Sequence, residues 1–314
     1  MLRPVTPVDL ASLLVLQFRA LPNQARSRRV LAAGPGRTIP YGSLVREWLP
    51  RRSGSHAWIL SRRGMAAGVV EVHRRLGPTC WEVSCLQAPR GATETMTELL
   101  DAACGAIADL GGHALFIRLL ADSPASLAAR YAQYTPYSSE ELYVRQGAPP
   151  LAPALSPDVG LLRRAEEPDL HQLYRLYQAV VPAPAREAEG MTFSQWREGL
   201  DLPRGWRRQD TVVLERGGDV AGWLTIAGSQ RKGIIDVLLG AEGREGAAAL
   251  IAAGLQASGR NRTTLCLVPS YQHFLAGPLK AMGFEKASEL VLHVRHVVAR
   301  VKERELAPAG AMPR

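Results

Sequence analysis

Two carboxylates occupy equivalent places in this chain of 314 residues, and they are the first candidates for proton chemistry. Glu82 lies in the segment 79–86 and Asp236 lies in the segment 233–239, and both segments have the pattern of a strand. A carboxylate that faces a cleft can accept a proton from a reacting group. A carboxylate with a purely structural partner would give the same pattern, so both interpretations stay open at this point.

A loop follows each of these predicted strands and leads into a predicted helix. Such a passage presents free backbone N–H groups and the positive end of a helix dipole, which suit a phosphate. The candidate anion contacts are Gln87, Arg90, Gly91, Ala92 and Thr93 in the first loop and Gly243, Arg244, Gly246 and Ala247 in the second. Because acidic residues also stabilise a helix start, a self-capped structural helix is the competing explanation for each loop.

These paired features belong to an internal repeat. Three groups of residues recur in the same order, with an offset that shrinks only between groups: Leu2-Arg3 and Asp9-Leu10 with Leu162-Arg163 and Asp169-Leu170, Ala67-Gly68 with Ala221-Gly222, and Glu141-Leu142 with Glu289-Leu290. The repeat unit of about 150 residues has the size of a domain and is too long for a solenoid repeat. The sequence therefore predicts one duplicated domain, with short deletions in the second copy.

Each copy predicts the same order of elements. A strand and a helix come first, followed by a variable region with a helix around Trp48 or Trp196, three strands, a helix, a strand, a helix and a last strand. This order predicts an α/β fold of the α+β kind, with a mixed, mostly antiparallel sheet flanked by helices. The predicted divisions are an N-terminal domain over 1–147, a Pro-rich linker over 148–160, a C-terminal domain over 161–300 and a flexible tail over 301–314.

The element order and the two loops resemble the GNAT acetyltransferase superfamily. Its acetyl-CoA pyrophosphate loop reads Arg or Gln, two residues, Gly, one residue, and Gly or Ala. Gln87 and Ala92 fall on the first and last of these positions, while Arg90 stands at the central glycine. In the second copy Arg244 and Gly246 match as anion contacts, and the Gly283-Phe284 pair is similar to the motif before the last strand of the family.

The resemblance implies two tandem GNAT-like domains and roles for particular residues. Glu82 and Asp236 are the implied bases that take a proton from an amine. A tyrosine from the helix after the fifth strand would return a proton to the leaving thiolate. The tyrosines in that region are Tyr131, Tyr134 and Tyr271.

The function implied is an N-acyltransferase that moves an acetyl or other acyl group from acyl-CoA to an amine, on a small molecule or a protein, with only one active copy. The first copy keeps more of the loop pattern and is slightly favoured as the cofactor site. The alternative is a tandem GNAT-like scaffold without catalysis, which binds a ligand or a partner. A third hypothesis, a transferase acting on aminoacyl-tRNA, requires a continuous basic groove between the copies.

Composition limits the other functions. The formal net charge of +9 comes almost wholly from arginine, and the arginine pairs are scattered, which argues against a nucleic-acid partner. The spacing of Cys80, Cys85, Cys104 and Cys266 predicts free thiols and no metal. No segment has the pattern of a signal peptide or a membrane span, so we expect a cytoplasmic protein. The oligomeric state does not follow from the sequence.

Overall fold

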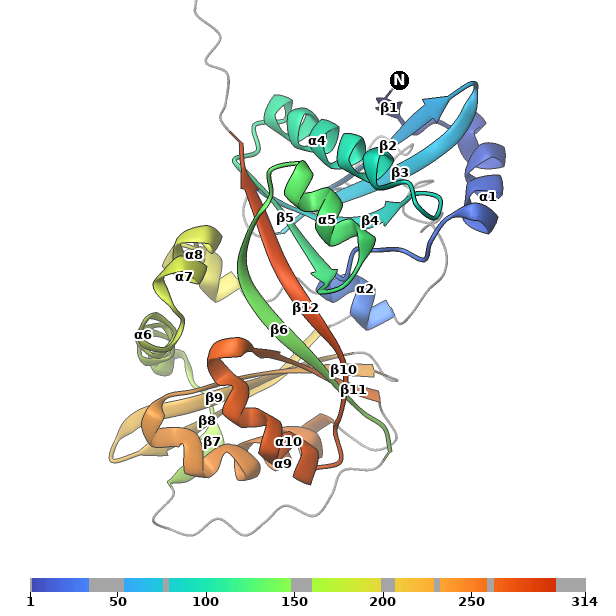
Figure 1. The fold of residues 1–314 in the computed structure, drawn as a ribbon. Coiled ribbons are helices and arrows are strands. Elements are labelled where there is room, and N and C mark those ends of the chain that lie inside the picture. The colour runs from blue at the N-terminus through green and yellow to red at the C-terminus, as the bar shows by residue number, and fades with distance from the viewer. Residues whose placement is uncertain are drawn as a thin grey trace, which may run out of the picture.

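The computed structural model describes residues 2–33, 54–75, 79–147, 160–198, 207–228, 232–258 and 263–297. The predicted tail, the predicted linker except for Gly160, and Trp48 lie outside these residues. One continuous sheet of twelve strands runs through the described part of the chain, in the order β1-β2-β3-β4-β5-β12-β6-β11-β10-β9-β8-β7 (Figure 1).

The two copies contribute equivalent sets of elements. The first copy supplies β1 Leu2–Pro4, α1 Leu10–Arg19, α2 Arg28–Ala33, β2 Ser55–Arg62, β3 Met65–Arg74, β4 Cys80–Gln87, α4 Thr93–Asp109, β5 Ala114–Leu120, α5 Pro124–Tyr131 and β6 Thr135–Arg145. The second supplies β7 Leu161–Arg164, α6 Leu170–Val180, α7 Ala183–Glu189, α8 Phe193–Glu198, β8 Arg207–Arg216, β9 Asp219–Gly228, β10 Lys232–Leu239, α9 Ala247–Ser258, β11 Thr263–Pro269, α10 Ala276–Ala281 and β12 Glu285–His296. The mixed, mostly antiparallel sheet is confirmed, because only the β4–β5 and β10–β11 pairs are parallel among the pairs described.

The repeat seen in the sequence is also a repeat of strand register. Leu2 pairs with Leu60 at the start of the first copy, and Leu162 pairs with Leu214 at the start of the second. Each copy then turns a hairpin on a glycine with positive φ, at Gly64 and at Gly218. Glycine suits these turns because it adopts a positive φ without the steric cost of a Cβ atom.

The last strands of the two copies are exchanged. β12 pairs with β5 of the first copy, and β6 pairs with β11 of the second. The two exchanged strands pair antiparallel with each other at the centre of the sheet, where Glu141 lies opposite Glu289. Lys286 contacts both carboxylates, with 2.6 Å between its Nζ and the nearer Glu141 oxygen. The cation offsets the repulsion that two like charges on facing strands would otherwise cause.

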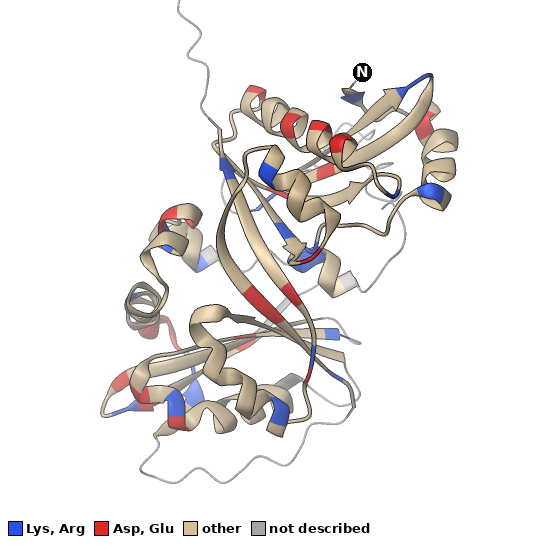
Figure 2. Cartoon of the chain, viewed as in Figure 1, with Lys and Arg blue, Asp and Glu red and all other residues tan. Residues whose placement is uncertain are grey.

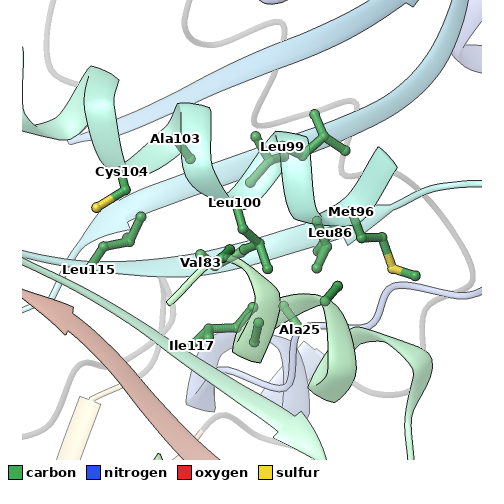
Figure 3. Packing of buried hydrophobic residues seen from close by; sticks show 14 of the residues in the cluster. Ala25, Val83, Leu86, Met96, Leu99, Leu100, Ala103, Cys104, Leu115 and Ile117 are labelled. Atoms are coloured by element: carbon green, nitrogen blue, oxygen red, sulfur yellow. The ribbon is translucent and has the colours of Figure 1, made fainter. Parts of the chain in front are cut away.

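Each half of the sheet has its own apolar core under a helix. Apolar residues on one face of α4, including Met96, Leu99, Leu100 and Ala103, are fully buried against β4 and β5 (Figure 3). Their spacing is that of one helical face, which is why this segment was predicted as a helix. In the second half α9 packs in the same way, and the core there includes Tyr143 of the exchanged strand β6. Because β6 belongs to the first copy and packs in the core of the second, the exchange connects the two cores through the chain as well as through strand pairing.

Candidate functional site

A cavity of about 190 Å³ lies between the two copies. Its walls come from α2, β4, β5 and β6 of the first copy and from α6, α7, α8, β8, β9, β10 and β11 of the second. The volume is far above the 10–15 Å³ that holds one water molecule, so the cavity can accept a small organic ligand. Both carboxylates that the repeat aligned, Glu82 and Asp236, line this single cavity.

Three arginine side chains in the cavity each pair with a carboxylate. Arg28 Nη1 lies 2.6 Å from Asp236, so a residue of the first copy neutralises the candidate base of the second. Arg75 Nη2 lies 3.0 Å from Glu189, and Arg118 Nε lies 3.0 Å from Glu140. Burial by itself lowers the pKa of Arg28, but the charges of Asp236 and Glu140 outweigh it and raise that pKa above its ordinary value. The pKa of Arg75 is raised as well, so Arg28 and Arg75 both stay charged.

Glu82 forms two longer ion pairs, and no described residue donates a hydrogen bond to it. The nearest guanidinium nitrogen, Arg118 Nη1, lies 3.7 Å away, and His73 Nε2 lies 3.8 Å away. Neither distance is a hydrogen bond. Arg118 Nη1 is itself buried and forms no hydrogen bond with any residue of the described part of the chain. Arg118 therefore lies between two carboxylates, with Nε bonded to Glu140 and Nη1 facing Glu82.

Aromatic side chains also line the cavity. Tyr177, Trp196 and Trp223 line it, and the rings of Tyr177 and Trp196 are 6.2 Å apart. The Tyr177 hydroxyl donates a hydrogen bond of 3.1 Å to Glu189. Charged and aromatic side chains therefore line the same cavity.

The candidate tyrosines lie in three different environments. Tyr271 lines the cavity, and burial, with the negative charges of Glu189 and Glu140, raises its pKa and keeps the phenol protonated. Tyr131 is 66% exposed and does not line the cavity. Tyr134 is buried in the core of the first copy, where its hydroxyl donates to the Leu100 carbonyl at 3.2 Å. The structure thus brings only Tyr271 together with the two candidate bases.

A second opening adjoins the cavity, between β10 and β11. These parallel strands pair only from Lys232 and Thr263 to Ile235 and Cys266, although both strands continue. Beyond this point the strands diverge, and Val237, Leu238 and Leu267 from the divergent segments line the cavity. Strands that separate leave main-chain groups able to pair with an extended ligand.

The end of the divergent β10 segment is held by one side chain. The Leu239 N–H donates to Gln272 Oε1 at 3.1 Å, and the Leu239 carbonyl accepts from Gln272 Nε2 at the same distance. The amide of Gln272 therefore occupies the edge of β10 next to the loop 241–246. The rest of the opening faces the cavity.

The equivalent opening in the first copy is filled by the chain itself. The β4–β5 pairing ends at Glu82 and Phe116, and the segment 20–27 lies between the strands beyond it. Leu21 N–H donates to Ala88, Gln24 N–H donates to Leu86 at 3.0 Å, and Arg26 N–H donates to Arg118 at 2.8 Å.

Asn23 completes this insertion with its side chain. Its Nδ2 donates to the Ser84 carbonyl at 2.8 Å, and its Oδ1 accepts from the Leu86 N–H at 2.9 Å. Ala25 is fully buried among the core side chains of the first copy (Figure 3). The main-chain groups that an extended ligand would use in this copy are therefore already paired.

The two loops after these strands also differ. In the first loop Gln87 is buried, whereas Arg90 and Gly91 are exposed, and α4 begins at Thr93 behind Ala92. In the second loop Gly243 and Gly246 are buried, and α9 begins at Ala247. Arg244 Cζ lies 4.6 Å from the centre of the Phe274 ring. The predicted contacts of each loop lie in the passage that leads from the strand into the following helix.

Charged positions are spread over the helices and strands of both halves (Figure 2). Among the described residues, no group of three or more His, Cys, Asp or Glu side chains is arranged to hold a metal ion. No helix in this part of the chain is long and apolar enough to cross a membrane.

The architecture matches solved structures along almost the whole chain. A GCN5-related N-acetyltransferase from Sphaerobacter thermophilus is 19% identical with a TM-score of 0.57, and the match covers 95% of each chain. A tandem GNAT protein from the clavulanic acid biosynthesis pathway is 16% identical with a TM-score of 0.54, over 95% of this chain and 98% of that one. This chain has the tandem GNAT fold. No family model and no curated protein sequence matches it.

The tandem GNAT fold confirms the fold class and the resemblance inferred from the sequence. Sequence reasoning missed several members of the site. Arg28 belongs to one of the scattered arginine pairs, Arg118 lies among the apolar residues of β5, and Glu140 lies next to Glu141 in β6. Trp223 lies in a predicted strand with alternating side-chain directions, and nothing in that pattern indicates a cavity. Nothing in the sequence signals that these residues meet.

Proposed function

We propose that this protein is an acyl-CoA-dependent N-acyltransferase whose acyl-CoA site is in the second copy and whose amine site is the cavity between the copies. The observation that carries the proposal is the contrast between the two strand openings. The opening between β10 and β11 adjoins a cavity that holds Asp236 and Tyr271. The opening between β4 and β5 is filled by the segment 20–27. The proposal reverses the slight preference for the first copy that the loop pattern gave.

The residues of the second copy fit an acyl-CoA. Its pantetheine arm is extended and carries amides, which can pair with diverging main-chain groups near Val237 and Leu267. Its pyrophosphate suits the loop 241–246 and the start of α9, where Arg244 adds a positive charge. When bound, acyl-CoA supplies an acyl group that is already activated as a thioester.

The protein residues then have to assist the removal of two protons from the amine nitrogen. Asp236 accepts the proton that an ammonium group must lose before its nitrogen can attack the acyl carbon. The C–N bond forms as the C–S bond breaks, and the second proton leaves the nitrogen for solvent, which restores the proton that Tyr271 gives to the sulfur. The Tyr271 hydroxyl, kept protonated by its raised pKa, can supply a proton to the leaving sulfur. The net products are an amide, a free thiol and one released proton.

The experiment that tests this proposal measures the release of free thiol from acetyl-CoA in the presence of a panel of amines. We expect Asp236→Asn to lower kcat/KM by about 10²- to 10⁴-fold, the usual effect of losing a general base. Tyr271→Phe should lower kcat by a smaller factor. Glu98→Gln, which alters an exposed carboxylate of the first copy paired with Arg62, is the matched control and should leave the rate unchanged.

Thiol release that is equal in the wild type and in Asp236→Asn would contradict the assigned base. An absence of acetyl-CoA binding at millimolar ligand would contradict the proposal as a whole. That result would favour the alternative, a tandem GNAT scaffold that binds another ligand in the same cavity.

A further inference from the structure

One charged side chain of the cavity lining differs from the others. Four arginines and four carboxylates line the cavity, and seven of these side chains form ion pairs with one another or with His73. Arg197, an exposed residue in the last turn of α8, is the exception, because no ion pair or hydrogen bond joins its side chain to any residue that the structure describes. Arg197 is therefore the lining cation that is open to a ligand anion.

The charges of the lining also balance. Equal numbers of arginines and carboxylates make the lining neutral as a whole when His73 is neutral. A charge that enters a partly buried site without a counter-charge is costly. A ligand that carries one positive and one negative group keeps the balance, whereas a simple ammonium ion adds a net charge.

The strand register places the candidate base next to an aromatic wall. Trp223 on β9 pairs with Leu238 on β10, and Asp236 precedes Leu238 by two residues, so its side chain lies on the same face of the sheet. Asp236 and Trp223 are therefore diagonal neighbours across the strand pair, a relation that separates side chains by about 7–8 Å.

Helix α8 brings Arg197 to the same wall. Trp196 packs against the buried side chains that Trp223 also contacts, those around Leu238 and Leu173. Arg197 follows Trp196 in the chain and lines the same cavity as Asp236. The cavity thus presents a carboxylate base, an indole wall and an unpaired guanidinium to a single ligand.

We infer that the acceptor is a small zwitterionic amine, with its amino group at Asp236, its carboxylate at Arg197 and its apolar part against Trp196 and Trp223. A guanidinium can hold a carboxylate through two parallel hydrogen bonds, which fixes the orientation of the ligand as well as its charge. This inference rests on the proposed function, because it names the class of amine that the cavity presents to the acyl donor.

The test is calorimetric binding of three matched probes to the whole protein at pH 7 and low salt, without acyl-CoA. The probes are 4-(aminomethyl)benzoate, its methyl ester, which lacks the negative charge, and 4-methylbenzoate, which lacks the amine. We expect the zwitterion to bind at least about threefold more tightly than either of the others, since an ion pair with an exposed arginine contributes modestly. Equal or tighter binding of the ester or of 4-methylbenzoate would overturn the inference.

Salt provides a second readout of the same contact. Because Arg197 is exposed, the preference for the zwitterion over its ester should shrink toward unity in about 0.5 M salt. The interaction of the amino group is common to both probes, so the ratio of their affinities isolates the carboxylate. A preference that salt does not reduce would contradict the pairing with Arg197.

One variant and its control locate the carboxylate. Arg197→Gln should abolish the preference for the zwitterion over the ester and leave the melting temperature unchanged, because the side chain has no partner in the described residues. Arg175→Gln alters an exposed arginine of α6 that does not line the cavity, and it should keep the preference. A preference that persists in Arg197→Gln, or that is lost equally in both variants, would overturn the inference.

The outcomes separate this inference from the proposed function. A preference for the zwitterion that depends on Arg197, without acyl transfer from acetyl-CoA to any amine of the panel, would contradict the transferase and keep the zwitterion site. Acyl transfer to the methyl ester with a kcat/KM equal to or above that for the zwitterion would keep the transferase and contradict the zwitterionic acceptor.

Discussion

At the scale of single residues, the duplication conserves an ion pair. Arg3 donates to both carboxylate oxygens of Asp9, and Arg163 does the same to Asp169, 160 residues later. Both aspartates are buried in front of the first helix of their copy. The guanidinium of Arg3 lowers the pKa of Asp9 from its ordinary value to about 2, and Arg163 likewise lowers the pKa of Asp169.

This lowering predicts how stability changes with pH. A carboxyl group whose pKa is depressed by folding stabilises the protein fully above its unfolded-state pKa, near 4, and loses that contribution as the pH falls through the folded-state pKa. We therefore expect the midpoint of urea unfolding to fall between pH 4 and pH 2. Asp9→Asn with Asp169→Asn should be less stable at pH 6 and should lose less stability on acidification.

The control for this prediction is Asp101→Asn, which alters a carboxylate that is 64% exposed and paired with Arg295. Its unfolding midpoint should follow that of the wild type across the pH range. An identical acid dependence in the wild type and in the double variant would show that the two pairs do not carry the effect.

At the scale of elements, the segment 20–27 distinguishes the copies. It is bound to β4 and β5 through main-chain hydrogen bonds and through Asn23. No equivalent segment is described between β10 and β11, where the Gln272 amide holds only Leu239. The two copies thus share strands, helices and register but differ in what lies between two diverging strands.

This difference predicts one acetyl-CoA per chain. Arg244→Ala should weaken acetyl-CoA binding by about 1–3 kcal/mol, the usual contribution of a hydrogen bond to a charged group. Arg90→Ala, at the matching loop of the first copy, should leave the affinity unchanged because the opening beside it is filled. Calorimetric titration measures both the affinity and the stoichiometry. Two sites per chain would assign a cofactor to both copies, and a loss of affinity only in Arg90→Ala would assign it to the first copy.

At the scale of the whole molecule, the exchanged strands bind the copies into one sheet. Tyr143 of β6 is buried in the core of the second copy, and Leu290 of β12 is buried with Leu142 and Ile234 at the centre. Neither copy can keep a complete sheet if the other unfolds, because each lends the other a strand.

We therefore expect the two copies to unfold in a single cooperative transition, although a chain of this length commonly unfolds in several steps. Scanning calorimetry should give one peak with equal calorimetric and van't Hoff enthalpies. Leu290→Ala should cost about 2–5 kcal/mol and should shift the whole peak. Two separated peaks, or a Leu290→Ala variant in which only part of the peak moves, would contradict this coupling.

The amino-acid sequence by itself determined the local structure and the duplication. Periodic apolar residues specified α4, glycines specified the hairpin turns at Gly64 and Gly218, and the repeated residue groups placed Leu60 and Leu214 at equivalent positions of their copies. These features depend on residues close together in the chain or on direct repetition. They were therefore accessible without coordinates.

Only the tertiary structure decided which strand completes which copy and what occupies each opening. The sequence of β6 and that of β12 are each compatible with pairing to β5 or to β11. A strand pairs through its main chain, and the two strands present similar side chains on their faces. The meeting of Arg28 with Asp236 spans 208 positions, and the filling of the first opening depends on a loop with no periodic pattern. The packing of the whole sheet fixes such long-range contacts, so the cavity and its charged residues can be identified only from the tertiary structure.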